Sequence, residues 1–351
     1  MSTSAAPFLV PSRLDEILAR IPKLRIAVLG DFFLDKYLVT DPALSERSIE
    51  TGLEARQVVD IRCSPGAAGT ITNNLGALGV GRVDAVGVIG DDGEGFELRR
   101  GLEAAGVGTS RLIRSSARFT PTYIKPMVQG VGPERELERM DIKNRSALSD
   151  SLQEEVVAGI VSILASETAD AVIIADQVQE RNCGVVTDHV RTGLCNLAKI
   201  YPQVTFFADS RCRIGEFQGV TLKPNQHEAA QALGREASPD EDPDRAASDG
   251  VSLAKRSGSR VFLTVGDQGI LVCTAKSYAH LPTISVHGPI DIVGAGDSAT
   301  AGIVCALCAG AKPEEAAMMG NLCASVTIRK LGTTGTASPH EVREMLARVN
   351  S

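Results

Sequence analysis

The segment 291–311 constrains the fold most strongly, because a Gly-Ala-Gly turn leads directly into a long run of small residues. Gly294 and Gly296 leave the backbone open to a ligand, since neither carries a side chain. The run that follows, Ala299–Ala311, predicts a helix. The first turn of a helix has N–H groups without intrahelical partners and carries the positive end of the helix dipole. This turn is therefore suited to bind an anion such as phosphate.

Asp297 lies at the mouth of this predicted anion site. A carboxylate there can take a proton from an attacking hydroxyl, which makes Asp297 a candidate catalytic base. The amides of Gly294, Ala295 and Gly296 are the candidate donors to a phosphate. An ordinary helix N-cap explains the same residues, because Asp and Ser are common at helix starts and Gly is common in turns. The motif alone favours the N-cap, and only the rest of the chain shifts the balance toward a base.

Buried strands alternate with helices along the middle of the chain. The strands are predicted at Arg25–Gly30, Ala171–Ala175 and Val204–Ala208, and the helices at Ser151–Leu164 and Gly184–Ile200. This rhythm predicts an α/β fold with a mostly parallel central sheet and helices on both faces. Two stretches, 37–64 and 110–141, show short alternating segments instead, and these predict β insertions. We expect a single domain over residues 1–351.

Charge and motifs exclude several classes of protein. A net charge of −7 argues against a nucleic-acid or anionic-membrane surface. The turn after Gly30 lacks Gly-x-Gly-x-x-Gly, and no Gly-Lys-Ser/Thr occurs anywhere, which excludes the most familiar nucleotide-binding loops. The longest uncharged run is too short to span a bilayer. The eight cysteines are scattered through predicted strands and helices, which is typical of reduced thiols, so we expect a cytoplasmic protein.

The string Asp-Ile-Val-Gly-Ala-Gly-Asp-Ser at 291–298 resembles the C-terminal signature of the ribokinase-like (PfkB) sugar kinases, usually Asp-Thr-Thr-Gly-Ala-Gly-Asp-Thr. Weaker segments from about Lys23 to Glu344 match the family in the same order, and the heptose-phosphate kinase domains are the most similar branch. The resemblance implies an ATP-dependent kinase acting on a hydroxyl of a sugar or sugar phosphate, with Asp297 as the base. It also implies that the two β insertions form a lid over the sugar and a homodimer contact.

The acceptor side of the resemblance rests on two segments. Asp31 and Asp35 match a Gly-Asp-x-x-Leu-Asp pattern in which a carboxylate holds sugar hydroxyls, although a solvated turn capped by Asp31 explains that pattern equally well. Gly66 and Ala67 match a Gly-Gly-Ala-Ala-Asn turn, which implies that they approach the sugar. Thr70 stands where the family usually has a sugar-binding Asn. Threonine is shorter and lacks the two amide donors, so the identity of the sugar stays open.

The nucleotide side rests on short patterns. Asn225-x-x-Glu228 resembles a family motif whose Glu holds Mg²⁺ largely through water, which suits an ion that prefers oxygen ligands and retains its waters. The same pattern is ordinarily a helix start, and Pro224 favours that alternative. The resemblance further implies nucleotide contacts at Thr264, Gly266, Gly269, Asn321 and Gly332.

Asp291 is implied to belong to a monovalent-cation site, such as one for K⁺. Ile292 and Val293 replace the usual threonines, so only a site made of backbone oxygens fits. Two alternatives to the sugar kinase remain: a catalytically weak sugar- or nucleotide-binding regulator on the same fold, and a nucleoside kinase. Thr70 motivates the regulator, while the presence of Asp297 and Glu228 counts against it.

Overall fold

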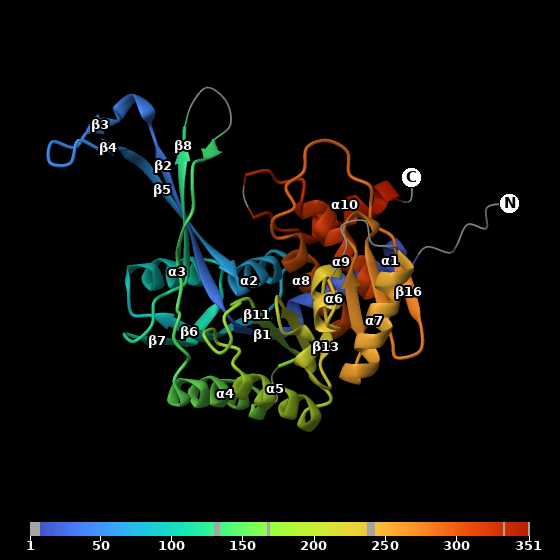
Figure 1. Cartoon of the computed structure of the whole chain (residues 1–351). Coiled ribbons are helices and arrows are strands. Elements are labelled where there is room, and N and C mark those ends of the chain that lie inside the picture. Colours follow the sequence, from blue (N-terminus) through green and yellow to red (C-terminus); the bar gives the residue numbers. More distant parts are fainter. Residues whose placement is uncertain (1–7, 130–133, 167–168, 237–242, 333, 350–351) are drawn as a thin grey trace.

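The computed structural model describes residues 8–129, 134–166, 169–236, 243–332 and 334–349 (Figure 1). Its centre is a nine-stranded sheet in the order β16-β15-β14-β13-β12-β11-β1-β6-β7. Every neighbouring pair from β7 to β14 is parallel, while β15 and β16 are antiparallel additions at one edge. The strands are β1 (Arg25–Gly30), β6 (Arg82–Gly90), β7 (Gly108–Ser115), β11 (Ala171–Asp176), β12 (Thr205–Ser210), β13 (Thr221–Leu222), β14 (Val261–Thr264), β15 (Ile270–Cys273) and β16 (Tyr278–Leu281).

Helices cover both faces of this sheet, because its central strands are apolar on both sides. In β1, Ile26 and Val28 belong to one buried cluster, and Ala27 and Leu29 belong to the other. The first cluster includes residues of α1 (Pro11–Arg20), α2 (Ala68–Ala77), α3 (Gly93–Ala104), α8 (Ala295–Cys308), α9 (Pro313–Thr327) and α10 (Pro339–Val349). The second includes residues of α4 (Asp150–Ala165), α5 (Asp188–Ile200), α6 (Gln226–Ala232) and α7 (Pro243–Ser257). The predicted α/β class, with a mostly parallel sheet and helices on both faces, is confirmed.

A second, smaller sheet rises from the body of the molecule (Figure 1). Its order is β10-β8-β2-β5, and β9 pairs with β8. β2 is antiparallel to β5 and parallel to β8. We call these strands the lid sheet: β2 (Phe32–Thr40), β5 (Val58–Ala67), β8 (Thr122–Val128), β9 (Arg135–Glu136) and β10 (Met140–Ile142). β3 (Glu46–Arg47) and β4 (Glu54–Ala55) form a hairpin of their own.

The strand boundaries of the lid sheet differ from the predicted insertions 37–64 and 110–141. β2 begins at Phe32, and only Asp31 separates it from the end of β1. The first lid segment therefore starts earlier than the predicted residue 37. β7 covers 110–115 but pairs with β6 in the central sheet. As an edge strand it is only partly buried, and its alternating pattern therefore resembles that of a lid strand. Residues 130–133 of the second insertion lie outside the described residues.

Two further predictions bear on the whole chain. Across the described ranges, no helix combines the length and apolarity needed to cross a bilayer. All eight cysteines are free thiols. Burial raises the pKa of Cys323 to about 12, and that of Cys305 also lies well above its usual value.

The short 3₁₀ helices are Ile21–Lys23, Pro42–Leu44, Ile214–Glu216 and Gly266–Gln268.

Candidate active site

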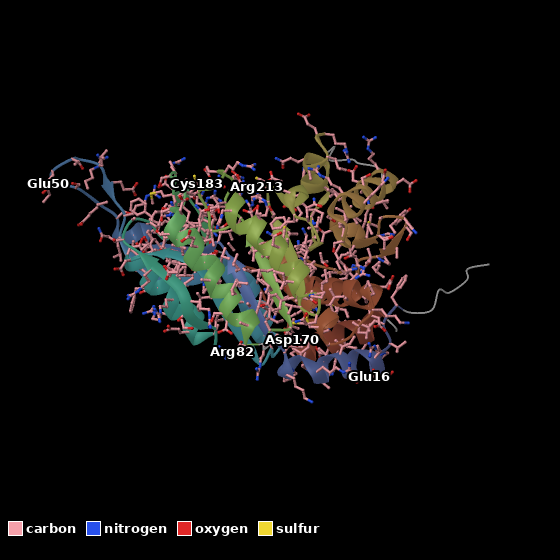
Figure 2. The ribbon with its side chains drawn as sticks, turned by 90° about the horizontal axis from the view of Figure 1, so that it is seen from below. Glu16, Glu50, Arg82, Asp170, Cys183 and Arg213 are labelled. Carbon is pink, nitrogen blue, oxygen red and sulfur yellow. The ribbon has the colours of Figure 1, made fainter. Side chains whose placement is uncertain are left out.

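Polar side chains gather where the parallel strands of the central sheet end. Asp31 follows β1, Asp176 ends β11, Asp209 is the penultimate residue of β12, and Lys223 follows β13. The carboxyl ends of parallel strands share one edge, which is where ligands of open α/β sheets bind. Figure 2 shows the two edges: Cys183 and Arg213 mark the carboxyl end, and Arg82 and Asp170 mark the opposite one.

The start of α8 has the geometry that the Gly-Ala-Gly turn predicts. Gly294 is the N-cap residue and has φ 81°, a conformation that favours glycine, and a Cβ there would lie 2.6 Å from Cγ2 of Thr334. No side chain caps this helix, so Asp297 is not its N-cap. The amide of Ala295 donates to the carbonyl of Ile292 at 3.2 Å. Within the described residues the amides of Gly294 and Gly296 have no such partner, so they remain available to an anion.

Asp297 lies in the first turn of α8, partly exposed. Burial raises the pKa of its carboxyl to about 7, and the negative charge of Asp209 adds to this shift. Lys223 and Arg211 oppose the shift, while Asp35 on β2 reinforces it. A carboxylate with a pKa near neutrality is well matched to general-base work. These neighbours also place the acid from α8 within electrostatic range of the lid sheet.

Lys223 and Asp209 form a buried ion pair beside the turn. The Nζ of Lys223 lies 2.9 Å from Oδ2 of Asp209, and Thr300 of α8 donates to the same oxygen at 3.2 Å. Burial lowers the pKa of Lys223, but the neighbouring carboxylates outweigh it and raise the pKa overall. The Nζ also lies 3.6 Å from where a Cβ on Gly296 would stand. Sequence reasoning missed both residues; the available signal was their position at the ends of buried strands.

Asp35 projects from β2 onto the backbone of β5. Its Oδ1 lies 3.1 Å from Nζ of Lys125 on β8, and this ammonium also donates to the hydroxyl of Tyr37 at 3.3 Å. A Cβ on Gly66 would lie 2.5 Å from Oδ2 of Asp35, so only glycine leaves room for the carboxylate. Two of the predicted acceptor residues, Asp35 and Gly66, are therefore in direct contact.

Ala67 and Thr70 lie at the start of α2, close to the α8 turn. Ala67 is the N-cap and has φ 53°, an uncommon conformation for a residue with a side chain. Thr70 is buried, and its methyl carbon lies 3.5 Å from where a Cβ on Gly294 would stand. The residue that replaces the family's usual Asn therefore packs against the predicted anion site.

Asp31 is buried, and backbone amides occupy most of its acceptor capacity. Its Oδ2 accepts from the amides of Gln177 and Val178 at 2.8 and 3.0 Å, and its Oδ1 accepts from Val185 at 2.7 Å. Burial raises the pKa of this carboxyl to about 6, and the charge of Asp176 adds to the effect. A carboxylate has about four acceptor positions, so roughly one is left for a ligand hydroxyl. The predicted solvated turn does not match this burial.

A buried ion pair supports the loop that Asp31 organises. Oδ1 of Asp176 lies 2.8 Å from Nη2 of Arg213, and Ser210 donates to Oδ2 at 2.6 Å. Arg213 also donates to the carbonyls of Val178 and Gln179. The loop after β11 is thus fixed by hydrogen bonds from its amides to Asp31 and from Arg213 to its carbonyls.

A cavity opens between this loop and the lid sheet. Phe33 and Tyr123 contribute aromatic walls, with ring centroids 5.2 Å apart in an edge-to-face arrangement. Four cationic side chains line the cavity, against two acidic ones: Arg118, Arg139, Lys143 and Arg211, against Asp31 and Glu180. The lining is net positive in a chain whose overall charge is −7. Asp35 and Asp297 are not among its lining residues, and Arg211 connects the cavity electrostatically to Asp297.

Asn225 and Glu228 form a capping box at the start of α6. Asn225 accepts from the Glu228 amide at 2.9 Å, and Oε2 of Glu228 accepts from the Asn225 amide at 2.7 Å. The interpretation of this pattern as a helix start is therefore correct. Burial raises the pKa of Glu228 to about 7, with the charge of Asp209 next in size. The Glu228 carboxylate thus caps the helix and also interacts electrostatically with Asp209 and Lys223.

The predicted nucleotide residues lie along the neighbouring strand ends. Thr264 donates its amide to the carbonyl of Pro224 at 3.0 Å, which places β14 beside the capping box. Gly266 and Gly269 have φ 60° and 103° in the turn after β14. Asn321 is buried and donates to the carbonyls of Leu281 and Pro282, both at 3.0 Å, so its amide secures the loop after β16.

Gly332 and Asp291 belong to loops that meet at the α8 turn. Gly332 has φ 70° and open space around it. The amide of Asp291 donates to the carbonyl of Ile328 at 2.8 Å, and its Oδ1 accepts from Val293 at 3.0 Å. Ile292 is 72% exposed and offers no side-chain oxygen. Among the described residues, no group of three acidic, His or Cys side chains is arranged to hold a metal ion without other ligands.

A nine-stranded sheet with a lid, a glycine turn on a helix N-terminus and acids at the adjoining strand ends define a ribokinase-like protein. The chain belongs to the pfkB family of carbohydrate kinases, whose family model matches residues 38–340.

Several relatives share most of the chain. It is 28% identical, over 92% of its length, to the bifunctional protein HldE of Citrifermentans bemidjiense, of which the match covers 63%. It is 29% identical, over 92% of its length, to HldE of Nitratiruptor sp., of which the match covers 65%. The chain therefore spans less than two thirds of the length of these relatives.

Solved structures agree on the fold. Phosphofructokinase-2 from Escherichia coli, in complex with potassium, matches with a TM-score of 0.72 at 18% identity, over 93% of this chain and 100% of that one. Ribokinase from Arabidopsis thaliana, complexed with ribose and ATP, matches with a TM-score of 0.66 at 17% identity, over 92% of this chain and 98% of that one.

Proposed function

We propose that this protein transfers the γ-phosphate of ATP to a hydroxyl of a sugar or sugar phosphate, with Asp297 as the general base. The observation that carries the proposal is the position of Asp297. It lies in the first turn of α8, beside amides that have no hydrogen-bond partner among the described residues, and its pKa is raised to about 7. A carboxyl with a pKa in this range is deprotonated in a substantial share of the protein molecules at neutral pH, and these can accept a proton.

The turn amides and Lys223 prepare this site for a charged phosphoryl group. The N–H groups of Gly294 and Gly296 lie at the N-terminus of α8, which is the positive end of the helix dipole. Lys223 supplies a buried positive charge 3.6 Å from the Cβ position of Gly296. One well-placed donor of this kind is worth about 3 kcal/mol in a transition state. In transfer, Asp297 takes the acceptor's proton as its oxygen attacks the γ-phosphorus.

The acceptor lies between the lid sheet and the α2 turn in this proposal. Asp35 binds its hydroxyls over Gly66, which leaves space for the carboxylate. Ala67 and Thr70, at the start of α2, also contact the acceptor in this proposal. Asp31 accepts a hydrogen bond from the acceptor at its remaining lone-pair position. The net positive cavity suits an acceptor that carries a phosphate as well as one that does not.

The nucleotide lies across the ends of β13, β14 and α6, with Asn225, Thr264, Gly266 and Gly269 along it. Glu228 is suited to hold Mg²⁺ through water, because its Oε2 is occupied by the Asn225 amide and no closed cage surrounds it in the described residues. Mg²⁺ would supply charge neutralisation on the β- and γ-phosphates. Asn321 and Gly332 line the adenine side.

We also propose a backbone-ligated K⁺ site at Asp291. The contacts of Asp291 with Ile328 and Val293 bring two loops together behind the α8 turn. A cation held there by carbonyl oxygens would support the loop from which the turn amides project. The homodimer belongs to the same proposal, with the exposed apolar residues of β5 in the lid sheet as its contact.

A panel of acceptors tests the proposal. Consumption of ATP is measured with sugars, sugar phosphates and nucleosides, together with a matched Asp297→Asn variant. We expect turnover with at least one sugar or sugar phosphate, and a loss of about 10²–10⁴-fold in the Asn variant with ATP affinity retained. Turnover of nucleosides alone, tight binding without turnover, or an active Asn variant would each contradict it.

A further inference from the structure

Among the described residues, Arg211 is the cationic residue of the cavity between the β11 loop and the lid sheet whose side chain makes no hydrogen bond or ion pair. It follows Ser210, the last residue of β12, and its amide donates to the carbonyl of Asp176 at 3.0 Å. This bond fixes the backbone at the carboxyl edge of the sheet. The side chain is exposed and lines the cavity. Throughout the described ranges, no hydrogen bond or ion pair engages its guanidinium.

The other cations of the cavity are already engaged. Arg118 donates to the carbonyls of Ser146, at 2.7 Å, and Cys183. Arg139 makes a two-point contact with Asp141, at 2.8 and 3.0 Å, and stacks 4.5 Å from the Tyr123 ring. Lys143 lies 3.9 Å from the same carboxylate. Arg211 is therefore the one cation of this cavity whose guanidinium has no partner among the described residues. A guanidinium offers five N–H donors in a fixed plane.

Arg211 lines the cavity and lies two residues after Asp209, whose carboxylate pairs with Lys223 beside the α8 turn. The charged groups that act on Asp297 come from several elements: Asp35 from β2, Asp209 and Arg211 from the end of β12, and Lys223 from the end of β13. Arg211 also acts on Glu228 of α6 and on Tyr123 of the lid sheet. The guanidinium is thus within electrostatic range of the base, of Glu228 on the nucleotide side and of the lid sheet.

We propose that Arg211 is a further catalytic residue, which binds the phosphoryl group during its transfer. The assignment rests on the proposed kinase function. The acceptor oxygen forms a bond to the γ-phosphorus, and the bond from that phosphorus to the bridging oxygen breaks. The electron pair of the broken bond leaves on ADP, and the acceptor proton goes to Asp297. The guanidinium donates to two oxygens of the group in transit, opposite the amides of the α8 turn, because a planar fork matches phosphate geometry.

Kinetics of two substitutions test this role. Arg211→Gln removes the charge and the fork, and we expect kcat to fall by about 10²–10³-fold, with KM for ATP and for the acceptor nearly unchanged. Arg211→Lys keeps the charge without the fork and should recover part of the loss. Arg245→Gln, an exposed change in α7, is the matched control and should leave kcat unchanged.

The pH profile distinguishes a catalytic role from a structural one. Arg211 lowers the pKa of Asp297, so its removal should raise that pKa further. The acid limb of kcat/KM should then move to higher pH in Arg211→Gln and stay in place in Arg245→Gln. An increase in the acceptor KM with full kcat would mean that the guanidinium binds an anionic group of the acceptor, and the proposal would be wrong. Unchanged kinetics would also overturn it.

A binding measurement is independent of turnover. MgADP with aluminium fluoride imitates the planar group in transit, and its affinity is measured by calorimetry against MgADP alone. The fluoride should tighten binding to the wild-type protein, and Arg211→Gln should lose this gain while its affinity for MgADP stays the same. An equal gain in both proteins, or none in the wild type, would refute the role of Arg211. If no acceptor is phosphorylated, the kinase proposal fails separately, and this measurement still decides the assignment.

Discussion

At the scale of single residues, the raised pKa of Asp297 determines how the rate depends on pH. Burial, with the charge of Asp209, raises that pKa to about 7. A general base acts in its deprotonated form, so kcat/KM should rise with pH, pass half of its maximum near pH 7 and level off above it. The profile is measured from about pH 5.5 to pH 9, a range that brackets this pKa. A flat profile through pH 7 would exclude Asp297 as the base.

The same pKa makes a prediction about stability. A carboxyl whose pKa is raised on folding binds its proton more tightly in the folded state. Its contribution is therefore complete below the unfolded pKa and is lost as pH rises through the folded pKa, near 7. Asp297→Asn removes a charge that the folded state disfavours, so the variant should melt at a higher temperature than the wild type at about pH 8, and the difference should shrink toward about pH 5. Thermal melts at both pH values measure it.

Glu228 has a structural and a proposed metal role, and one substitution separates them. Glu228→Gln keeps an acceptor for the Asn225 amide, since glutamine also serves in a capping box. The melting temperature should therefore stay close to that of the wild type. The Mg²⁺ concentration needed for half-maximal rate should rise by about 10–100-fold, as for other outer-shell ligands. An unchanged Mg²⁺ requirement would leave Glu228 as a helix cap alone.

The sequence identifies some of these residues but not others. The glycine turn predicts that Asp297 lies at the start of a helix, but the turn alone favours an N-cap, and only the resemblance of the whole chain to the sugar kinases makes Asp297 a candidate base. Lys223 and Arg211 carry no local motif, and their roles depend on strands that are distant in sequence ending at one edge. The partners of Asp31 lie about 150 residues away, in the loop that contains Gln177 and Val185, so a local pattern could not show that its carboxylate is occupied.

At the scale of elements, the contact between β2 and β5 decides the shape of the acceptor site. Gly66→Ala would place a Cβ 2.5 Å from Oδ2 of Asp35, so the carboxylate must move. We expect KM for the acceptor to rise by about 10-fold or more, because a small misplacement of a positioning group has large effects, while ATP affinity is kept.

A second glycine provides the matched control for this variant. Gly93, at the start of α3, has open space around its Cβ position and no positive φ. Gly93→Ala should leave both KM values unchanged and stabilise the helix slightly. If Gly66→Ala also leaves the acceptor KM unchanged, Asp35 does not bind the acceptor as proposed.

Element types were easier to predict than element partners. β1 is predicted with its observed bounds because a buried strand is a continuous apolar run that ends at Gly30. β7 shows the opposite case: its alternation indicates a half-buried strand, and that pattern is the same whether the strand closes the edge of the central sheet or joins the lid sheet. Which strands pair depends on contacts between distant parts of the chain, so it cannot be predicted from the periodicity of one segment.

At the scale of the whole molecule, the two ends of the described chain are secured, while the outer end of the lid sheet is exposed. α1 and α10 pack together, and Arg343 lies 2.6 Å from Asp15 across their contact. The lid sheet projects from the body (Figure 1). Val59 and Ile61 lie close together at the start of β5 and are 47% and 58% exposed. Exposed apolar side chains on a sheet mark an interaction surface.

A second copy of this chain is the occupant that we propose for this face, and charge substitution tests it. Ile61→Glu places a carboxylate where the two lid sheets would meet, so the dimer should dissociate at concentrations at which the wild type remains associated, because an unpaired charge in an interface is costly. Sedimentation velocity measures the change. Ile200→Glu, at the exposed end of α5, is the control and should not alter the mass. A monomeric wild type, or an Ile61→Glu variant that stays dimeric, would show that the lid sheet is not the dimer contact. Because Asp35 and Lys125 lie on the same sheet, a true lid dimer should also lose acceptor affinity when it dissociates.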